Sequence, residues 1–166
     1  MKYNVSQLLL SFTGTTSNFL TETDDLIEGN ILVLNGMVVH MYKVHDGIWV
    51  EVNGPCKITG TCSRCLNEFE YIMEIKGEQE YISVLDIGTE NLETDRFLID
   101  DRHELDITEL VRQTAIVSSN VKTLCLDSCR GLCAQCGTNL NIENCNCVGQ
   151  WLDPRWAALI ELTKKI

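Results

Sequence analysis

The pattern of hydrophobic and polar positions between residues 31 and 84 is typical of β-strands. Five segments rich in β-branched and aromatic residues, partly alternating with polar ones, predict strands at 31–34 (ILVL), 37–44 (MVVHMYKV), 48–52 (IWVEV), 56–62 (CKITGTC) and 69–75 (FEYIMEI). Turn dipeptides separate them at Asn35-Gly36 and Asp46-Gly47, which suit type I′ hairpins, and a third turn is predicted at Asn53-Gly54-Pro55. The pattern predicts an antiparallel meander, curled or barrel-like, with one face that must be covered.

The flanking segments predict the cover. An apolar stretch at 3–12 could open the sheet, and the polar residues 13–25 predict a loop. Asp106-Ile107-Thr108-Glu109 fits a capping-box start for a helix that ends near 118–120, and Asp153-Pro154 fits the start of a second helix. The fold class is therefore α+β, an antiparallel sheet covered by helices. We expect a sheet domain over 1–120 and a cysteine-rich segment with the last helix over 121–166, packed on the sheet.

Six of the nine cysteines lie between residues 124 and 147. Cys133-Ala-Gln-Cys136-Gly137 has the spacing of a zinc knuckle, in which two thiolates face one ion at about 2.3 Å and glycine accepts the positive φ that follows. Cys145 and Cys147 form a second close pair. The sequence therefore predicts that Cys133, Cys136, Cys145 and Cys147 hold one structural zinc ion.

A second half-site lies in the β region, where Cys62 and Cys65 have the same spacing. With Cys125 and Cys129 they could complete a second four-cysteine site. The alternative is that Cys62 and Cys65 are small buried strand residues and that one ion is held by four of the six later cysteines. The sequence leaves both arrangements open. Cys56 is expected to be a small buried hydrophobe.

Other uses of the cysteines have less support. Disulfides need an oxidising compartment, whereas no export signal or apolar run of 18 residues is evident, so we expect a cytoplasmic protein that does not enter a membrane. A thiol oxidoreductase usually places its Cys-x-x-Cys pair at a helix N-terminus, but here glycine and asparagines follow the pair. The histidines are scattered and no catalytic motif is present, so the chain is predicted not to be an enzyme.

The net charge of −11 disfavours a broad phosphate-binding face. Between residues 78 and 106, ten acidic side chains face only Arg96 and Arg102. This run is either a solvated surface or one that attracts a basic partner, and in the second case Asp100, Asp101 and Glu104 are the candidate partner-binding residues. The candidate RNA contacts lie near the cysteines: Arg64, Arg130 and Arg155. Scattered solvated charges are the alternative for these arginines, and a zinc-ribbon RNA-binding module is the alternative function.

Several motifs together resemble the bacterial YceD family: Cys62-Ser-Arg-Cys65-Leu66, Asp106-Ile-Thr-Glu-Leu110, the cysteine pattern from Leu124 to Cys147, and Asp153-Pro-Arg155. The resemblance runs over most of the chain. It implies a role in the accumulation of large-subunit ribosomal RNA, and thus in ribosome biogenesis, without an enzymatic activity. Family members are often encoded beside a small zinc-ribbon protein of the large ribosomal subunit, which implies that the partner is a ribosomal assembly intermediate containing a basic large-subunit protein. Shorter members lack the downstream cysteines.

Overall fold

A computed structural model describes residues 1–27, 30–84, 97–147 and 154–156. The chain divides into two compact units. The first comprises residues 1–60 and 68–121, and the second comprises residues 61–67 and 122–166. Residues 61–67, which the sequence alone placed with the sheet, thus group with the cysteine-rich segment.

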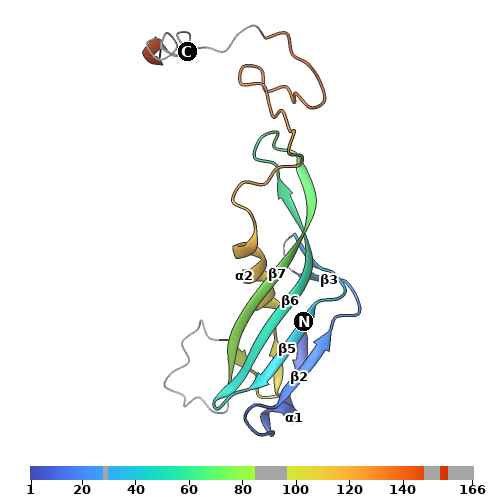
Figure 1. Cartoon of the computed structure of the whole chain (residues 1–166), viewed down its shortest axis with the longest axis vertical. Helices are drawn as coiled ribbons and strands as arrows, with labels where there is room; N and C mark the ends of the chain where they lie inside the picture. Colours follow the sequence, from blue (N-terminus) through green and yellow to red (C-terminus); the bar gives the residue numbers. More distant parts are fainter. Residues whose placement is uncertain (28–29, 85–96, 148–153, 157–166) are drawn as a thin grey trace, which may run out of the picture. The chain divides into compact units, whose positions relative to one another are not determined.

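Nine strands among the described residues form one curled sheet in the order β1-β9-β8-β7-β6-β4-β3, with β5 pairing β6 and β2 pairing β5 (Figure 1). Their bounds are β1 Lys2–Asn4, β2 Thr16–Leu20, β3 Asp25–Ile27, β4 Ile31–Val33, β5 Val38–Lys43, β6 Gly47–Thr61, β7 Glu68–Ser83, β8 Leu98–Ile99 and β9 Glu104–Asp106. Strand β8 runs parallel to β7, with Ile82 opposite Leu98. The prediction of a purely antiparallel sheet is therefore wrong, and the sheet is mixed.

The predicted turn at Asn53-Gly54-Pro55 is also wrong, because β6 runs straight through it. These residues mark the point where β6 changes neighbour, from β5 (Val38 opposite Asn53) to β4 (Val33 opposite Cys56). Proline is tolerated where a strand changes neighbour, since a missing N–H costs least there. Gly54 is needed for close packing, because a Cβ atom at this position would lie 2.5 Å from the Met37 Cα atom.

The two predicted hairpin turns differ from the expected geometry. Strands β4 and β5, on either side of Asn35-Gly36, both run antiparallel to β6, so they follow one another along its edge and form no hairpin. Asp46-Gly47 does join the paired strands β5 and β6, with Lys43 opposite Ile48. Neither Asp46 nor Gly47 has a positive φ, so the turn is not of type I′, which needs a positive φ at both central residues.

The N-terminal segment contains more regular structure than the polar pattern predicts. The apolar stretch opens the sheet as strand β1 and continues as the short helix α1 (Ser6–Leu9). The expected loop at 13–25 instead contains β2, which pairs with β5 along its whole length. Its Thr, Ser and Asn residues hide the alternation, while Phe19 packs against Tyr3 with ring centroids 4.9 Å apart.

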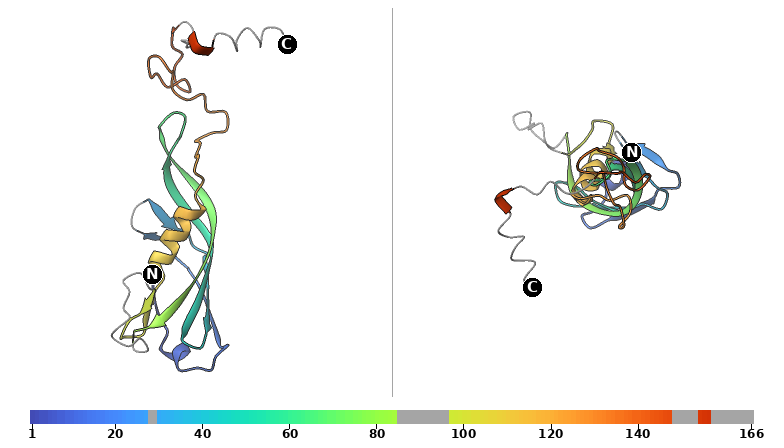
Figure 2. Two further views of the ribbon diagram at one scale, coloured as in Figure 1. Left: turned by 90° about the vertical axis from the view of Figure 1, so that its left-hand side faces the viewer. Right: turned by 90° about the horizontal axis from the view of Figure 1, so that it is seen from above.

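Helix α2 (Thr108–Ser118) packs along β7 and covers the curled sheet, as the left view of Figure 2 shows. It buries Leu110, Val111 and Ala115. The N-cap residue is Ile107 and not the predicted Asp106, although the Asp106 carboxylate accepts the Thr108 N–H at 2.9 Å. The predicted capping box does not form, because the Glu109 carboxylate accepts hydrogen bonds from Arg112 and Gln113 instead.

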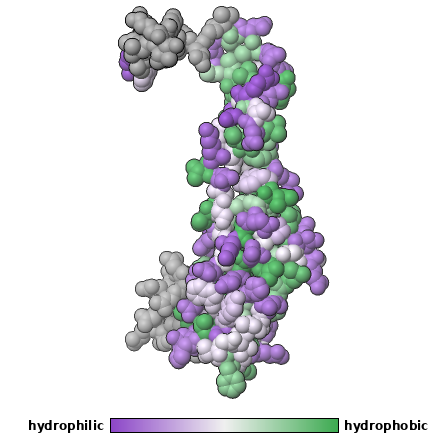
Figure 3. Space-filling view, in the orientation of Figure 1, coloured by the Kyte–Doolittle hydropathy of each residue, from purple (hydrophilic) through white to green (hydrophobic). Residues whose placement is uncertain are grey.

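The core of the first unit lies between α2 and the sheet. Its fully buried members include Tyr81, Met37, Met41, Ile48, Ile75, Ile99, Leu105 and Ile107, and Cys56 is buried with them as predicted. On the face shown in Figure 3, hydrophobic residues lie among hydrophilic ones over strands β6 and β7. No helix among the described residues is long and apolar enough to span a membrane. Of the predicted last helix, Pro154–Trp156 form a 3-10 turn, and the rest lies outside the described residues.

Candidate metal centres

The second unit brings eight cysteines together in two groups of four. The sulfurs of Cys62, Cys65, Cys125 and Cys129 all lie within 4.8 Å of one another. The Cys62 and Cys129 sulfurs are 3.9 Å apart, and those of Cys65 and Cys125 are 3.6 Å apart. Four thiolates around a tetrahedral zinc ion at about 2.3 Å would have sulfurs about 3.8 Å apart. We call these four cysteines the first cluster. Their sulfur spacing fits one tetrahedral ion, as the alternative of two ions per chain requires.

The Cys62–Cys65 pair sits in a tight turn. The Leu66 N–H donates to the Cys62 carbonyl at 2.9 Å, and the Cys62 N–H donates to the Asn67 carbonyl at 2.9 Å. Leu66 has a φ of 59°, a conformation that costs a residue with a Cβ atom about 1–2 kcal/mol. The turn therefore holds both sulfurs toward one point in spite of this strain.

The second cluster is Cys133, Cys136, Cys145 and Cys147, whose sulfurs also lie within 4.8 Å of one another. Its first pair uses the same turn: the Gly137 N–H donates to the Cys133 carbonyl at 2.9 Å, and Gly137 has a φ of 74°. Here the positive φ falls on glycine, as the sequence predicted.

The two clusters differ in their exposure to solvent. Cys62, Cys65 and Cys129 are at most 4% exposed, whereas Cys136 and Cys147 are exposed. A metal ion in the first cluster would be shielded by protein. One in the second would be open to solvent on the side of Cys136 and Cys147.

Neighbouring groups split the pKa values of the thiols within each cluster. Backbone N–H groups of Cys125 and Cys65 lower the pKa of Cys62 to about 6, while burial raises the pKa of Cys125 to about 12. In the second cluster, hydrogen bonding to Thr138 lowers the pKa of Cys136 to about 6, and the neighbouring Cys136 thiolate raises the pKa of Cys147 to about 12. A divalent cation would allow all four sulfurs to ionise, because it compensates their mutual repulsion.

Arg64 supports the first cluster from outside. Its guanidinium donates to the carbonyls of Asp127 at 3.1 Å and Cys129 at 2.9 Å, and thereby fixes the turn that carries Cys129. A Cβ atom on Gly131 would lie 2.9 Å from the Arg64 carbonyl oxygen, so the two segments pack closely. The sequence pattern does not reveal this role, and only the position of Arg64 between two cysteines hints at it.

Of the other two candidate RNA contacts, Arg130 donates to the Asn144 side chain at 3.4 Å. Arg155 is exposed and lies in the short 3-10 turn. Arg64 and Arg130 therefore both bind groups of the protein itself. An RNA-binding role for the three arginines stays a prediction.

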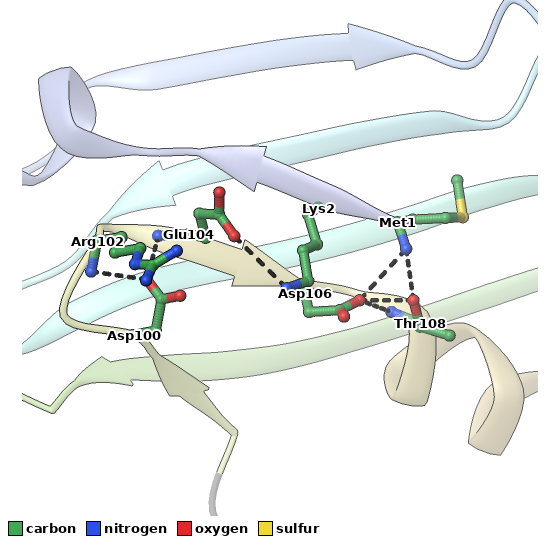
Figure 4. Close-up of polar contacts among 7 residues, drawn as sticks. All are labelled: Met1, Lys2, Asp100, Arg102, Glu104, Asp106 and Thr108. Atoms are coloured by element: carbon green, nitrogen blue, oxygen red, sulfur yellow. Dashed lines mark hydrogen bonds and ion pairs between the residues drawn. The ribbon is translucent and has the colours of Figure 1, made fainter.

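The candidate partner-binding residues lie in the first unit, at the β8–β9 turn (Figure 4). The Asp100 carboxylate accepts the N–H groups of Arg102 at 2.9 Å and Glu104 at 2.6 Å, so it holds the turn. Glu104 pairs with Lys2 at 3.5 Å. Asp101 is exposed at the tip of the turn. Of the three acidic residues, Asp101 is thus the most exposed to solvent. Residues 85–96, which belong to the same acidic run, lie outside the described residues.

The chemistry available to the clusters is limited. Four thiolates fill the coordination sphere of a tetrahedral ion, so they leave no open position for a substrate or an activated water. No helix follows Cys133 and Cys136 within residues 133–147, so the dipole that activates a redox Cys-x-x-Cys pair is absent there. The arrangement is suited to a structural ion.

A family model and one relative indicate the same family. The model described as "Large ribosomal RNA subunit accumulation protein YceD" matches residues 50–163, more than half of the chain. An Arabidopsis thaliana chloroplast protein described as a homolog of that protein is 29% identical over 63 residues, which are 38% of this chain and 20% of the relative. Uncharacterized proteins of Mycobacterium tuberculosis and Mycobacterium bovis are 28% identical over 123 residues, 72% of this chain and 58% of each relative. The search of solved structures gave no match.

Proposed function

Because this chain belongs to the YceD family, we propose that it is a non-catalytic factor in ribosome biogenesis that supports the accumulation of large-subunit ribosomal RNA. The observation that carries the proposal is the family match over residues 50–163, which includes both cysteine clusters. The curated relatives are matched over only 20% and 58% of their lengths, so the activity of the whole protein is part of the proposal.

Zinc is the metal that we propose for both clusters. All-thiolate sites of this spacing favour zinc or iron–sulfur clusters, and structural zinc sites are commonly held by four cysteines. The burial of the first cluster and the paired turns of both support two ions per chain. Residues Cys62, Cys65, Cys125 and Cys129 would hold one ion, and Cys133, Cys136, Cys145 and Cys147 the other.

The first test is the level of ribosomal RNA in cells. Depleting the protein is expected to lower the ratio of large- to small-subunit RNA, and the intact chain should restore it. A Cys65→Ser chain should fail to do so, because it lacks a ligand of the buried cluster. Ser63→Ala, a change at an exposed residue of the same turn, is the matched control. An unchanged RNA ratio after depletion would contradict the proposed function, whereas full rescue by Cys65→Ser would show that the cluster is dispensable for it.

The partner that we propose is a basic protein of the large subunit, bound within an assembly intermediate in the cytoplasm. The net charge of −11 and the exposed Asp101 favour a basic protein over direct RNA contact, since like charges repel. RNA would then be bound indirectly. The alternative, a zinc-ribbon module that contacts RNA through arginines near the clusters, has less support because Arg64 and Arg130 bind protein groups.

Salt and nuclease distinguish these partners. We expect the protein to retain purified large-subunit proteins after nuclease treatment at low salt and to lose them at high salt, because exposed charges are screened. Asp101→Asn should weaken the association by a few-fold. Asp100 is unsuitable for this test, since its carboxylate holds the turn. Binding that disappears with nuclease and is insensitive to Asp101→Asn would instead favour the RNA-binding module.

A further inference from the structure

One side chain from the loop of the second cluster reaches a sulfur of the first cluster. Asn141 lies in the loop between Cys136 and Cys145, two cysteines of the second cluster, yet its amide nitrogen donates to the sulfur of Cys129 in the first cluster at 3.3 Å. Cys129 is 4% exposed, so this hydrogen bond reaches a buried sulfur. Asn141 itself lies at the surface.

Its neighbours determine which end of the Asn141 amide faces the sulfur. The Arg130 backbone N–H donates to the Asn141 Oδ1 atom at 2.8 Å, which requires an acceptor on that side. The Nδ2 atom is left to face Cys129 and also donates to the Asn139 side-chain oxygen at 2.9 Å. A thiolate can only accept, so the donor is oriented correctly for an ionised, metal-bound Cys129.

The loop that carries Asn141 runs between two cysteines of the second cluster, and backbone hydrogen bonds join it to residues 131–133. The Cys133 N–H donates to the Thr138 carbonyl and the Leu140 N–H to the Gly131 carbonyl, both at 2.9 Å. The loop begins after Cys136 and ends at Cys145, so an ion bound by these two cysteines would close it. Filling the second cluster would thus hold Asn141 in place against the first.

We propose that Asn141 is a positioning residue that couples the two metal sites, so that an ion in the second cluster tightens the binding of the ion in the first. The inference rests on zinc binding in the proposed function. A hydrogen bond to a ligand sulfur disperses its negative charge, and outer-shell partners of this kind change metal affinity by about 10- to 100-fold. By linkage, the first ion tightens the binding of the second by the same factor.

The first experiment compares two substitutions that add the same charge to one loop. Metal-free protein is titrated with Co²⁺, whose thiolate charge-transfer bands report four-sulfur coordination, and then with Zn²⁺ against a competing chelator. Asn141→Asp replaces the donor that faces Cys129 by a carboxylate oxygen, and should lower the affinity of the first site at least tenfold. Asn144→Asp keeps an oxygen acceptor for Arg130 and should change that affinity less than twofold. Equal effects of the two variants would overturn the proposal.

The second experiment measures the coupling itself. Cys136→Ser empties the second site and is expected to lower the affinity of the first site, as Asn141→Ala does. If Asn141 carries the coupling, the variant with both substitutions, Cys136→Ser and Asn141→Ala, should bind the first ion no less tightly than the weaker-binding of the two single variants. Additive losses would show that the second site acts on the first by a route other than Asn141, and no loss in Cys136→Ser would show that the two sites act independently; either result would overturn the proposal.

The outcomes also distinguish this inference from the zinc proposal. Intact protein that binds neither Co²⁺ nor Zn²⁺ would contradict both. Intact protein that binds two ions, with the Asn141 variants unchanged, would contradict only the coupling. Each variant must still give the four-sulfur Co²⁺ spectrum at saturation, which shows that its first site forms.

Discussion

Removing the metal is expected to unfold the second unit and leave the first unit folded. The buried hydrophobic side chains among the described residues of the second unit are Cys62, Cys65 and Cys129, the proposed ligands themselves. None of its described leucine or isoleucine side chains is buried: Leu66 and Leu126 are 63% exposed and Ile142 74%, and three further leucines are half-buried, namely Leu124, Leu132 and Leu140. Structural zinc contributes about 10–16 kcal/mol of apparent binding free energy at neutral pH, so little else would keep this unit folded.

Elemental analysis and hydrogen exchange test this expectation together. Protein purified without chelator should contain two zinc ions per chain. After chelation, amide protection should be lost in residues 61–67 and 122–147 and retained in β5, β6 up to Gly60, and α2. Cys65→Ser should reproduce the loss around the first cluster at one ion per chain, with Ser63→Ala as the unaffected control. Unchanged protection in chelated protein, or all nine thiols titratable as purified, would contradict the prediction.

The cysteine spacing predicted the metal-binding groups more completely than the hydrophobic pattern predicted the strands and their pairing. Cys-x-x-Cys spacing is a local constraint, because one turn places both sulfurs, and the same turn occurs at Cys62–Cys65 and Cys133–Cys136. Which pairs share an ion depends on contacts between distant segments, such as the Ser63 N–H donating to the Thr123 carbonyl at 2.9 Å. The sequence therefore left one and two ions open, whereas the structure groups the cysteines in two sets of four.

The errors in the predicted fold have a common physical cause. Gly54-Pro55 resembles a turn locally, but it lies where β6 changes partner and where Met37 leaves no space for a side chain. The parallel pairing of β8 with β7 joins Leu98 to Ile82 across a long connection, which no local pattern encodes. Strand β2 was missed because its pairing with β5, rather than its own composition, stabilises it. Local propensity is outweighed by tertiary contacts at each of these places.

The role of Asn141 could not be predicted for a related reason. Four asparagines lie between Cys136 and Cys147, and all suit turns equally well. Only the folded loop distinguishes Asn141, whose amide reaches the first cluster, from Asn144, whose oxygen accepts from Arg130. A side chain that contacts a metal-binding cysteine from a different segment of the chain has no fixed sequence spacing from that cysteine, so the sequence does not reveal it.

Tyr81→Ala is expected to destabilise the first unit by about 3–5 kcal/mol, the typical cost of removing a large buried aromatic side chain. Tyr81 lies on β7, is 1% exposed and contacts Phe97 edge-on with ring centroids 5.3 Å apart. Its hydroxyl donates to the Asp106 carbonyl at 3.2 Å, so it links β7 to the end of β9 just before α2. Domains are stable by only about 5–15 kcal/mol, so this loss is a large fraction of the total.

Tyr81→Ala should destabilise the first unit and spare the second, whereas metal removal should do the opposite, because the first unit has an apolar core of its own. Tyr81→Phe keeps the ring and loses one hydrogen bond, so it should cost about 1 kcal/mol and serves as the matched control. When urea unfolding is monitored by hydrogen exchange, the Tyr81→Ala protein should lose amide protection first in β7, β9 and α2. The Co²⁺ spectrum and the two metal ions should remain, since all eight proposed ligands lie in the other unit. Loss of metal in step with the unfolding of the sheet would show instead that the two units fold as one.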